Sequence, residues 1–331
     1  MKAMTLSAFG GAPDSFEAAQ LADPVPGPGE VLVRVIAASI NPADVKIRQH
    51  GGLAAPALPA VLGCDMAGVV VAIGDGVTSF AVGDRVYGCV GGVRGSAGTY
   101  AELVVADARL LAHAPEQLSL HDAAALPLVA ITAWEALDRL GVGEGTHLLV
   151  HGGAGGVGHV AIQLAKARGA RVATTISSPD KAEIVRGFGA DDIINYREEA
   201  VEAYVERLTG GQGFDAVFDS TGGSDLATSF AAARVNGQVA VIVASYSADL
   251  TPMHAKALSF HAIMMLVPLL YGTGREAHGQ ILTEVAKLAD QGKLKPLIDA
   301  ERFTLSEVGG AHARLESGRA LGKLVIDVAA E

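Results

Sequence analysis

The chain has only two cysteines, Cys64 and Cys89, among its 331 residues. Two cysteines cannot build the disulfide framework of a small secreted domain, and they cannot build a four-thiolate zinc site either. The first twelve residues hold one lysine and no apolar run that leads into a small-residue cleavage site, so no signal peptide is expected. These features indicate a reducing compartment, and the expected location is the cytoplasm.

Positive charge and long apolar runs are also scarce. The chain has 25 Lys and Arg against 36 Asp and Glu, which gives a formal net charge of −11. Binding to a nucleic acid backbone depends on clustered basic groups, so no nucleic acid partner is expected. The most apolar stretch, residues 262–270, contains Pro268 and is about half as long as a helix that spans a membrane, so no membrane partner is expected either.

Hydrophobic residues and glycines are abundant. Half of the residues are hydrophobic and 41 are glycines, and at roughly 150 residues per domain the length predicts about two domains. Up to about residue 115, short apolar runs at residues 30–36, 67–73 and 84–90 are bounded by turn-forming Gly, Pro and Asp, which predicts a β-rich domain.

From about residue 120 the pattern changes to buried strands that alternate with helices. Strands are predicted at residues 146–151, 171–176, 192–195, 214–219 and 238–243, with helices at residues 159–168, 179–188 and 198–208. Ser178 is the expected N-cap of the second helix. This repetition predicts an α/β fold with a doubly wound parallel sheet.

The end of the chain returns to the first domain. A helix is predicted at residues 279–291 and a closing strand at residues 323–328, which has no partner left in the parallel sheet. We therefore expect the α/β domain to be an insertion. The expected boundaries are residues 1–123 for the first part of the β-rich domain, residues 124–262 for the inserted domain, and residues 263–331 for the return.

A glycine-rich turn lies between the first predicted strand of the inserted domain and its first helix. Residues 153–158 read Gly-Ala-Gly-Gly-Val-Gly, which fits the G-x-G-x-x-G pattern of dinucleotide-binding turns. Such a turn brings the backbone close to a pyrophosphate, which the N-terminus of the following helix also attracts. The expected contacts are Gly153, Gly155, Gly156, Val157 and Gly158. The alternative, a turn that matters only for packing, is disfavoured by the flanking strand and helix.

The residues after the second strand bear on the choice of nucleotide. An NAD enzyme places an acid there for the ribose 2′-hydroxyl, but the nearest acid, Asp180, lies in the first turn of the next helix, where it complements the helix dipole. Ser177, Ser178 and Lys181 instead suit a 2′-phosphate, because hydroxyls, a cation and a helix start converge on one anion. NADPH is therefore the expected cofactor. The alternative for Lys181 is an ordinary solvated helix lysine.

Five motifs together resemble one family, and the likeness runs over essentially the whole chain. The chain resembles the zinc-independent quinone oxidoreductase branch of the medium-chain dehydrogenase/reductase superfamily in the glycine turn and at residues 41–44, 63–70, 83–86 and 132–133. The resemblance implies a GroES-like β-rich catalytic domain with an inserted Rossmann domain. It also implies a homodimer built by joining the sheets of the nucleotide domains edge to edge.

The resemblance bears on metal binding too. Zinc-dependent members of the superfamily place a Cys where Asn41 stands and Gly-His-Glu where this chain has Gly-Cys-Asp at residues 63–65. A tetrahedral catalytic site needs further ligands, which the sequence does not offer at matching positions, so no metal is expected. Cys64 is then expected to be a small buried hydrophobe.

Without zinc, the protein must position NADPH and stabilise negative charge on the substrate oxygen. Related quinone reductases commonly carry a Tyr where this chain has Lys46, whereas a Lys there resembles the enone and alkenal reductases of the same branch. Lys46 is therefore a candidate oxyanion donor; the alternative is a lysine that pairs with Asp44 or with solvent. By resemblance Asn41 lies beside the nicotinamide. A purely structural role for its side chain, in an Asx-type turn before Pro42, is an equally good interpretation.

The resemblance implies further cofactor contacts at Thr132, Tyr196, Ala244, Ser245 and Lys323. The function it implies is an NADPH-dependent reductase of a small hydrophobic conjugated carbonyl, a quinone or an α,β-unsaturated carbonyl compound. Two alternatives remain open at this stage. One is a zinc-type alcohol dehydrogenase, and the other is a non-catalytic NADPH-binding protein with a regulatory or structural role.

Overall fold

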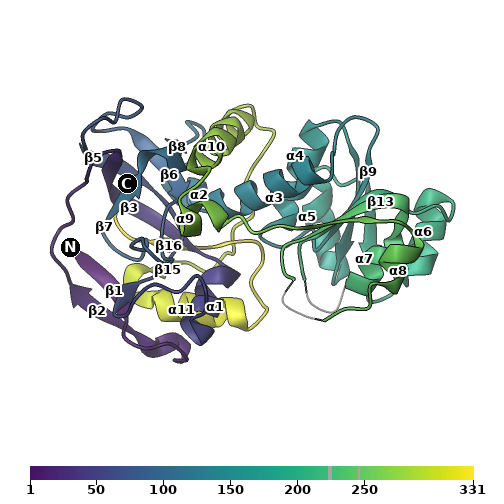
Figure 1. Ribbon diagram of the computed structural model, residues 1–331, viewed down its shortest axis with the longest axis horizontal. Coiled ribbons are helices and arrows are strands. Elements are labelled where there is room, and N and C mark those ends of the chain that lie inside the picture. The colour runs from purple at the N-terminus through teal and green to yellow at the C-terminus, as the bar shows by residue number, and fades with distance from the viewer. Residues whose placement is uncertain (223–225, 245–246) are drawn as a thin grey trace. The chain divides into compact units, whose positions relative to one another are not determined.

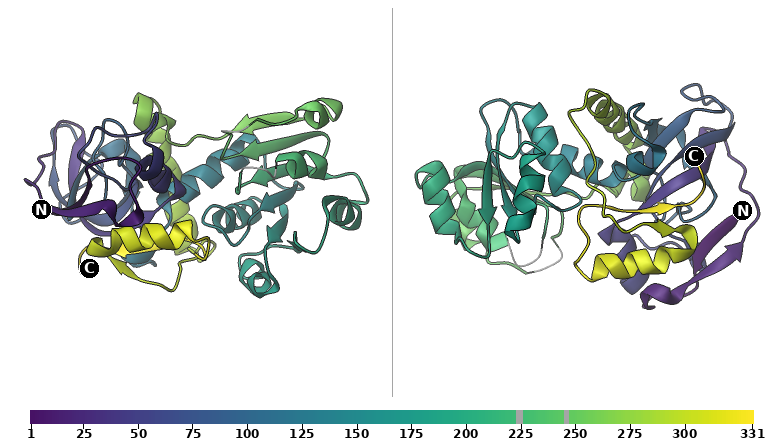
Figure 2. Two further views of the ribbon diagram at one scale, coloured as in Figure 1. Left: turned by 90° about the horizontal axis from the view of Figure 1, so that it is seen from below. Right: turned by 180° about the vertical axis from the view of Figure 1, so that it is seen from behind.

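The chain folds into two compact units. The computed structural model describes residues 1–222, 226–244 and 247–331. Unit 1 comprises Met1–Ile131 and Leu266–Glu331, and unit 2 comprises Thr132–Met265 (Figure 1). Both labelled chain ends lie in unit 1, as Figure 2 shows from two further sides. The unit boundaries fall eight residues after residue 123 and three residues after residue 262, the positions expected from the sequence.

Unit 1 is built on two β-sheets. Within the described residues the larger sheet has the order β15-β16-β3-β5-β6-β8, with β7 (Leu103–Asp107) pairing with β3. The bounds are β15 (Phe303–Thr304), β16 (Leu324–Asp327), β3 (Glu30–Ile40), β5 (Asp65–Ile73), β6 (Arg85–Cys89) and β8 (Leu111–His113). The smaller sheet has the order β2-β1-β4, formed by β2 (Phe16–Gln20), β1 (Lys2–Leu6) and β4 (Ala60–Val61). This architecture confirms the predicted β-rich domain.

Short helices connect and cover these sheets. They are α1 (Pro42–His50), α2 (Leu120–Ala123), α9 (Val267–Tyr271), α10 (Arg275–Asp290) and α11 (Val308–Glu316), with 3-10 turns η1 (Pro13–Ser15), η2 (Ala108–Leu110) and η4 (Leu305–Glu307). The helix predicted at residues 279–291 therefore begins four residues earlier. No helix among the described residues has the length and apolar character needed to cross a bilayer.

The closing strand joins the first domain, as the sequence predicts. β16 pairs antiparallel with β3, and Leu324 lies opposite Ile40, the last residue of β3. Lys323 directly precedes β16, and Asn41 directly follows β3. The pairing register therefore brings these two residues together although they are 282 positions apart in the sequence.

Unit 2 contains a six-stranded sheet whose strands are all parallel. Its order is β11-β10-β9-β12-β13-β14. The strands are β9 (His147–His151), β10 (Arg171–Ile176), β11 (Asp192–Asn195), β12 (Phe214–Asp219), β13 (Ala233–Val241) and β14 (Ser259–Ala262). Counted along the chain this is the order 3-2-1-4-5-6, which confirms the predicted doubly wound sheet.

Helices pack along the unit 2 sheet and supply much of its core. They are α3 (Pro127–Arg139), which begins in unit 1, α4 (Gly158–Ala167), α5 (Ala182–Arg186), α6 (Val201–Thr209), α7 (Leu226–Ala232) and α8 (Thr251–Ala255). One buried cluster joins Tyr204 of α6 and Phe230 of α7 to Leu149 of β9 and Val217 of β12. The apolar segments that were predicted as buried strands are therefore strands covered by helices.

The helix predicted at residues 179–188 differs in detail. It starts as a 3-10 turn, η3 (Pro179–Lys181), and continues as the short α5. Ser178 has extended backbone at the start but its side chain makes no capping hydrogen bond. The Ser178 hydroxyl instead hydrogen-bonds to the Asp180 carboxylate and helps to lower the pKa of that acid. Competition from a nearby carboxylate is the physical reason why the predicted cap does not form.

Candidate functional site

The glycine turn of unit 2 lies directly between β9 and α4, as predicted. Gly152 has a φ of +76°, a conformation that glycine adopts without strain. Its N–H donates to the Thr175 hydroxyl over 2.9 Å, and the N–H of Gly153 donates to the Thr175 carbonyl over 3.1 Å. The end of β10 therefore holds the turn in place through a hydroxyl and a carbonyl.

The turn is too tight for side chains at two of its glycines. A Cβ on Gly153 would lie 2.2 Å from the Thr174 hydroxyl oxygen, and one on Gly158 would lie 2.1 Å from the Gly152 carbonyl oxygen. No side chain caps the N-terminus of α4, which follows the turn. A narrow backbone turn with an uncapped helix start matches what a pyrophosphate needs, so the residues present fit a dinucleotide.

The residues predicted to select the nucleotide lie together beyond β10. The Lys181 ammonium donates to the Ser177 hydroxyl over 2.8 Å, and both side chains are half-buried. Tyr196 follows β11, its N–H donates to the carbonyl of Ile176 at the end of β10, and its side chain is 53% exposed. A hydroxyl and an ammonium thus follow β10, and a half-exposed aromatic ring, with the Arg197 guanidinium 5.9 Å above its centroid, follows the neighbouring β11.

Three further residues of unit 2 are predicted cofactor contacts. Thr132 is buried in α3, and Ala244 is exposed after β13. Ser245 lies outside the described residues. Their contact with a cofactor stays a prediction.

Sequence reasoning missed three side chains that shape this edge. Thr174 donates from its hydroxyl to the Val150 carbonyl over 2.8 Å, beside the Thr175 bond to the turn. Asp219, buried at the end of β12, accepts hydrogen bonds from the N–H groups of Thr221 and Gly222 at 3.0 and 2.8 Å. These residues could have been recognised as candidates from their place in the sequence, because each stands at or near the carboxyl end of a predicted buried strand.

A second cluster of predicted residues lies in unit 1, around Asn41. Asn41 is the N-cap of α1, and its N–H donates to the Asp44 carboxylate over 2.8 Å in a capping box. The alternative offered by the sequence was an Asx-type turn before Pro42, and the structure has this capping box at the same place. The Asn41 side chain has further partners, since its Nδ2 donates to Asp65 Oδ2 over 2.9 Å.

Lys323 completes this cluster. Its ammonium donates to the Asn41 Oδ1 and, over 3.0 Å, to the Ile40 carbonyl, and it lies 3.6 Å from Asp65 Oδ2. The side chain is 3% exposed, and three protein oxygens surround its three hydrogens. Lys323 thus forms a buried ion pair with Asp65, and its contact with the cofactor stays a prediction.

Burial shifts the pKa values of this cluster. It raises the pKa of Asp65 and lowers that of Lys323, and each group opposes the shift of the other. It raises the pKa of Asp44 to about 6, against hydrogen bonds from Cys64 and Asn41. A hydrogen bond with Cys89 and burial raise the pKa of the Cys64 thiol, which fits the expected small buried hydrophobe.

Lys46, the candidate oxyanion donor, lies on α1 with an exposed side chain. No hydrogen bond or ion pair joins it to Asp44, which is fully buried, so the alternative role of pairing with that acid is not realised. The described residues contain no group of three His, Cys, Asp or Glu side chains that could hold a metal ion.

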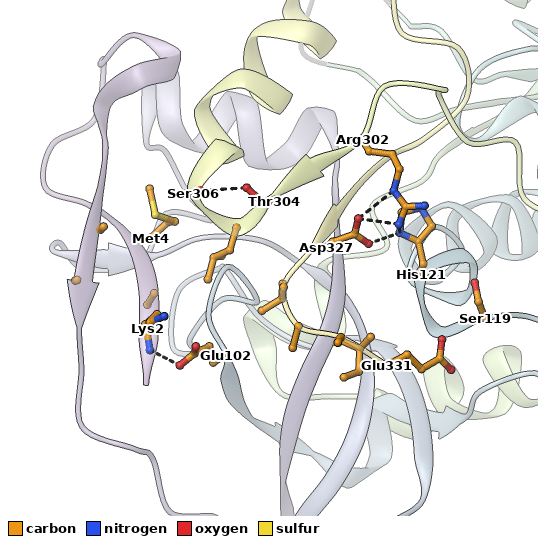
Figure 3. A pocket seen from close by; sticks show the side chains of 18 of the residues that line it. Lys2, Met4, Glu102, Ser119, His121, Arg302, Thr304, Ser306, Asp327 and Glu331 are labelled. Atoms are coloured by element: carbon orange, nitrogen blue, oxygen red, sulfur yellow. Dashed lines mark hydrogen bonds and ion pairs between the residues drawn. The ribbon is translucent and has the colours of Figure 1, made fainter.

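Unit 1 also has a cavity of about 1090 Å³ that contains none of the predicted site residues. Figure 3 shows its polar side: His121 Nδ1 contacts Asp327 over 2.7 Å, and Arg302 binds the same carboxylate over 2.8 Å. His121 and Arg302 thus share the Asp327 carboxylate, and none of the residues that line the cavity belongs to the Asn41 cluster.

Comparison with known proteins agrees with both units. The protein-family model described as alcohol dehydrogenase GroES-like domain matches residues 27–116. The family model described as zinc-binding dehydrogenase matches residues 188–326. A quinone oxidoreductase from Pseudomonas aeruginosa is 34% identical over 329 residues, covering 98% of this chain and 99% of the relative.

Two further comparisons extend this picture. An NADPH-dependent alkenal/one oxidoreductase from Arabidopsis thaliana is 34% identical over 333 residues, covering 98% of this chain and 79% of the relative. The crystal structure of an alcohol dehydrogenase superfamily protein from Novosphingobium aromaticivorans superimposes with a TM-score of 0.95 at 42% identity, over 99% of this chain and all of the other. The chain belongs to the quinone oxidoreductase branch of the medium-chain dehydrogenase/reductase superfamily.

Proposed function

We propose that this protein is an NADPH-dependent reductase that transfers hydride to a quinone or to an α,β-unsaturated carbonyl compound without zinc. The observation that carries the proposal is the Asn41 cluster. Zinc-dependent relatives are expected to have ligands at Asn41 and Cys64, whereas here an amide and a buried thiol stand there, beside the Lys323 ammonium. A site that offers hydrogen-bond donors in place of a metal suits the stabilisation of an oxyanion.

The glycine turn and the groups after β10 support NADPH as the cofactor. The turn and the start of α4 would hold the pyrophosphate, and Ser177 and Lys181 would hold the 2′-phosphate. When bound, NADPH supplies the hydride. The alkenal/one oxidoreductase relative is named as NADPH-dependent, which agrees with this assignment.

The protein's own contribution is to bind the substrate oxygen and to provide a proton. Lys46 presents a solvated ammonium on α1, which can donate to an oxygen that gains negative charge. Asn41 offers an amide N–H nearby in sequence, held by α1 and β3. The names of the two relatives, one a quinone reductase and one an alkenal reductase, define the acceptor class that we propose.

Assembly and location are part of the same proposal. β14 is the last strand in the order of the unit 2 sheet, so one of its edges has no strand partner among the described residues. A homodimer formed by pairing two such edges follows from the resemblance and would bury that edge. The reducing cytoplasm suits the two free, buried cysteines.

The test is a panel of quinones, enones and alkenals assayed with NADPH and with NADH, alongside metal analysis. We expect oxidation of NADPH with at least one acceptor class and no loss of turnover after dialysis against a chelator. Tight NADPH binding without turnover of any acceptor would support a non-catalytic role. Stoichiometric zinc that is required for turnover would support an alcohol dehydrogenase of the zinc type.

Lys46→Ala tests the donor within this function. Loss of one oxyanion donor typically lowers kcat by about 10²- to 10³-fold, so kcat should fall in this range while NADPH affinity stays within about threefold. Lys293→Ala is the control, because Lys293 is an exposed lysine of the same unit. An unchanged kcat for Lys46→Ala would remove Lys46 from the mechanism.

A further inference from the structure

The Asn41 amide is held between opposite charges. An asparagine side chain has one accepting oxygen and one donating nitrogen, and its two orientations differ by a flip that exchanges them. Here the Oδ1 faces the Lys323 ammonium, and the Nδ2 faces Asp65 Oδ2 at 2.9 Å. A flipped amide would direct its oxygen at a carboxylate and its nitrogen at an ammonium, which is unfavourable on both sides.

The two charges are themselves fixed. Asp65 accepts from the Ser39 hydroxyl at 3.1 Å and from the Leu128 N–H at 2.9 Å, and its side chain has no exposed surface. Lys323 is held by the Ile40 carbonyl at 3.0 Å and by the ion pair with Asp65. Partners with so many contacts cannot turn away to accommodate another amide orientation.

One hydrogen of the amide remains. Nδ2 carries two hydrogens, and Asp65 accepts one of them; among the described residues no partner is recorded for the second. A spare N–H on a fully buried side chain costs free energy unless something accepts it. Asn41 has no exposed surface in this structure, so the amide has to become exposed before the carbonyl oxygen of a bound carboxamide or substrate can accept this hydrogen.

We propose that Lys323 and Asp65 are positioning residues that fix the Asn41 amide in one orientation, so that Asn41 acts toward its ligand as a hydrogen-bond donor and never as an acceptor. This inference rests on the proposed function for the identity of the ligand. The orientation itself does not depend on that function, because it follows from contacts within unit 1. In this view Lys323 serves the cofactor through Asn41 and does not touch it.

The experiment compares Lys323→Met with Lys323→Gln. Both variants lose the charge and keep a side chain of similar length, but glutamine retains an N–H that can donate to the Asn41 oxygen. Misplacement of a positioned group costs up to about 10²-fold, so we expect kcat to fall about 10- to 100-fold in Lys323→Met and clearly less in Lys323→Gln. The Kd for NADPH should change less than kcat in both.

A second readout needs no turnover. In ¹⁵N-labelled protein without cofactor, the side-chain amide signal of Asn41 is identified by its loss in Asn41→Asp. We expect Lys323→Met to shift this signal and to speed its exchange with water, Lys323→Gln to preserve it largely, and Lys293→Met to leave it unchanged. Equal kcat values for Met and Gln, or an amide signal unaffected by Lys323→Met, would overturn the inference.

The design separates the possible failures. If removal of Lys323 prevents folding because Asp65 is left as an unpaired buried charge, the same Met and Gln pair is compared in the Asp65→Asn background, which contains neither charge. If the wild-type protein turns over no acceptor, the proposed function fails, and the amide signal still decides the inference. If turnover is normal and the signal does not respond, the inference alone fails.

Discussion

The Lys181 ammonium donates a hydrogen bond to the Ser177 hydroxyl over 2.8 Å, across the start of the helix that follows β10. The contact holds a cation and a hydroxyl where the second strand of a dinucleotide-binding sheet ends. The hydroxyl keeps its own hydrogen free to donate, so both groups remain able to bind an anion.

Lys181→Ala should therefore weaken NADPH binding selectively. A charge-assisted hydrogen bond is worth about 1.5 to 3 kcal/mol, so we expect the Kd for NADPH to rise roughly 10- to 100-fold. The Kd for NADH, which has no 2′-phosphate, should change little. Fluorescence titration with both nucleotides measures the difference, with Lys287→Ala on α10 as the control; equal losses for both nucleotides would contradict the assignment.

Gly158→Ala should destroy the turn, and Gly155→Ala should not. The added Cβ would lie 2.1 Å from the Gly152 carbonyl oxygen at Gly158, whereas at Gly155 the same oxygen is 3.1 Å away and can adjust. We expect Gly158→Ala to abolish measurable NADPH binding and to lower the Tm of unit 2. Calorimetry of both variants without NADPH isolates the effect on the turn, and an equal Tm in both would refute the steric argument.

Asp44→Asn should change how stability depends on pH. Burial raises the pKa of Asp44 to about 6 from its ordinary 3.8, so the folded protein binds its proton more tightly than the unfolded chain does. The stabilisation is present below pH 3.8 and is lost as the pH rises through about 6. The two pKa values differ by about two, which corresponds to about 3 kcal/mol.

Asparagine at position 44 can still accept the hydrogen bond from the Asn41 N–H, while it carries no charge at any pH. Relative to wild type, Asp44→Asn should therefore be more stable at pH 7.5 than at pH 4.5, by on the order of 2 kcal/mol. Urea unfolding at the two pH values tests this. A stability difference that does not change with pH would show that Asp44 titrates normally.

His312 should make the free energy of unfolding depend on pH in the direction opposite to that of Asp44. It packs edge-on against Phe16 and Tyr100, and burial together with the charge of Arg48 lowers its pKa to about 3 from 6.5. The folded protein thus resists protonating a group that the unfolded chain protonates readily. The stabilisation is complete above pH 6.5 and declines as the pH falls towards 3.

His312→Gln removes this acid sensitivity. Between pH 6.5 and pH 5 the histidine accounts for a loss of about 2 kcal/mol in the free energy of unfolding, and the variant should lose less than wild type by about that amount. Urea unfolding in this pH interval supplies the comparison. A wild type and variant with parallel pH profiles would show that His312 is protonated without cost.

The parts of the structure that could be predicted are those that local chemistry decides. The glycine turn, its flanking strand and helix, and five of the six described strands of unit 2 follow from periodicity and from turn residues within short windows, whereas β14 was not predicted. Ser177 and Lys181 could be expected to lie close together because both come soon after a predicted strand, while their contact with a 2′-phosphate stays a prediction. The closing strand could be assigned to unit 1 because none of the five predicted parallel strands was left as its partner.

The parts that escaped prediction depend on tertiary contacts. Ser178 is a good capping residue by type, but Asp180 competes for its hydroxyl. Lys323 could be proposed only as a cofactor contact, because nothing near it in sequence shows that the register of β16 on β3 places it against Asn41. Thr175 and Asp219 have no special local pattern and gain their roles from where their strands end.

The pairing of β16 with β3 has a consequence for how the protein is made. Asn41 and Asp65 emerge from the ribosome early, whereas Lys323 follows only after all of unit 2 has been synthesised. During translation the first segment of unit 1 therefore lacks the cation that neutralises its buried acid. A truncated product that stops before Lys323 would retain every residue of the nucleotide-binding sheet. It would lack the ammonium that fixes the Asn41 side chain and pairs with Asp65, so the last strand is needed to complete the Asn41 cluster.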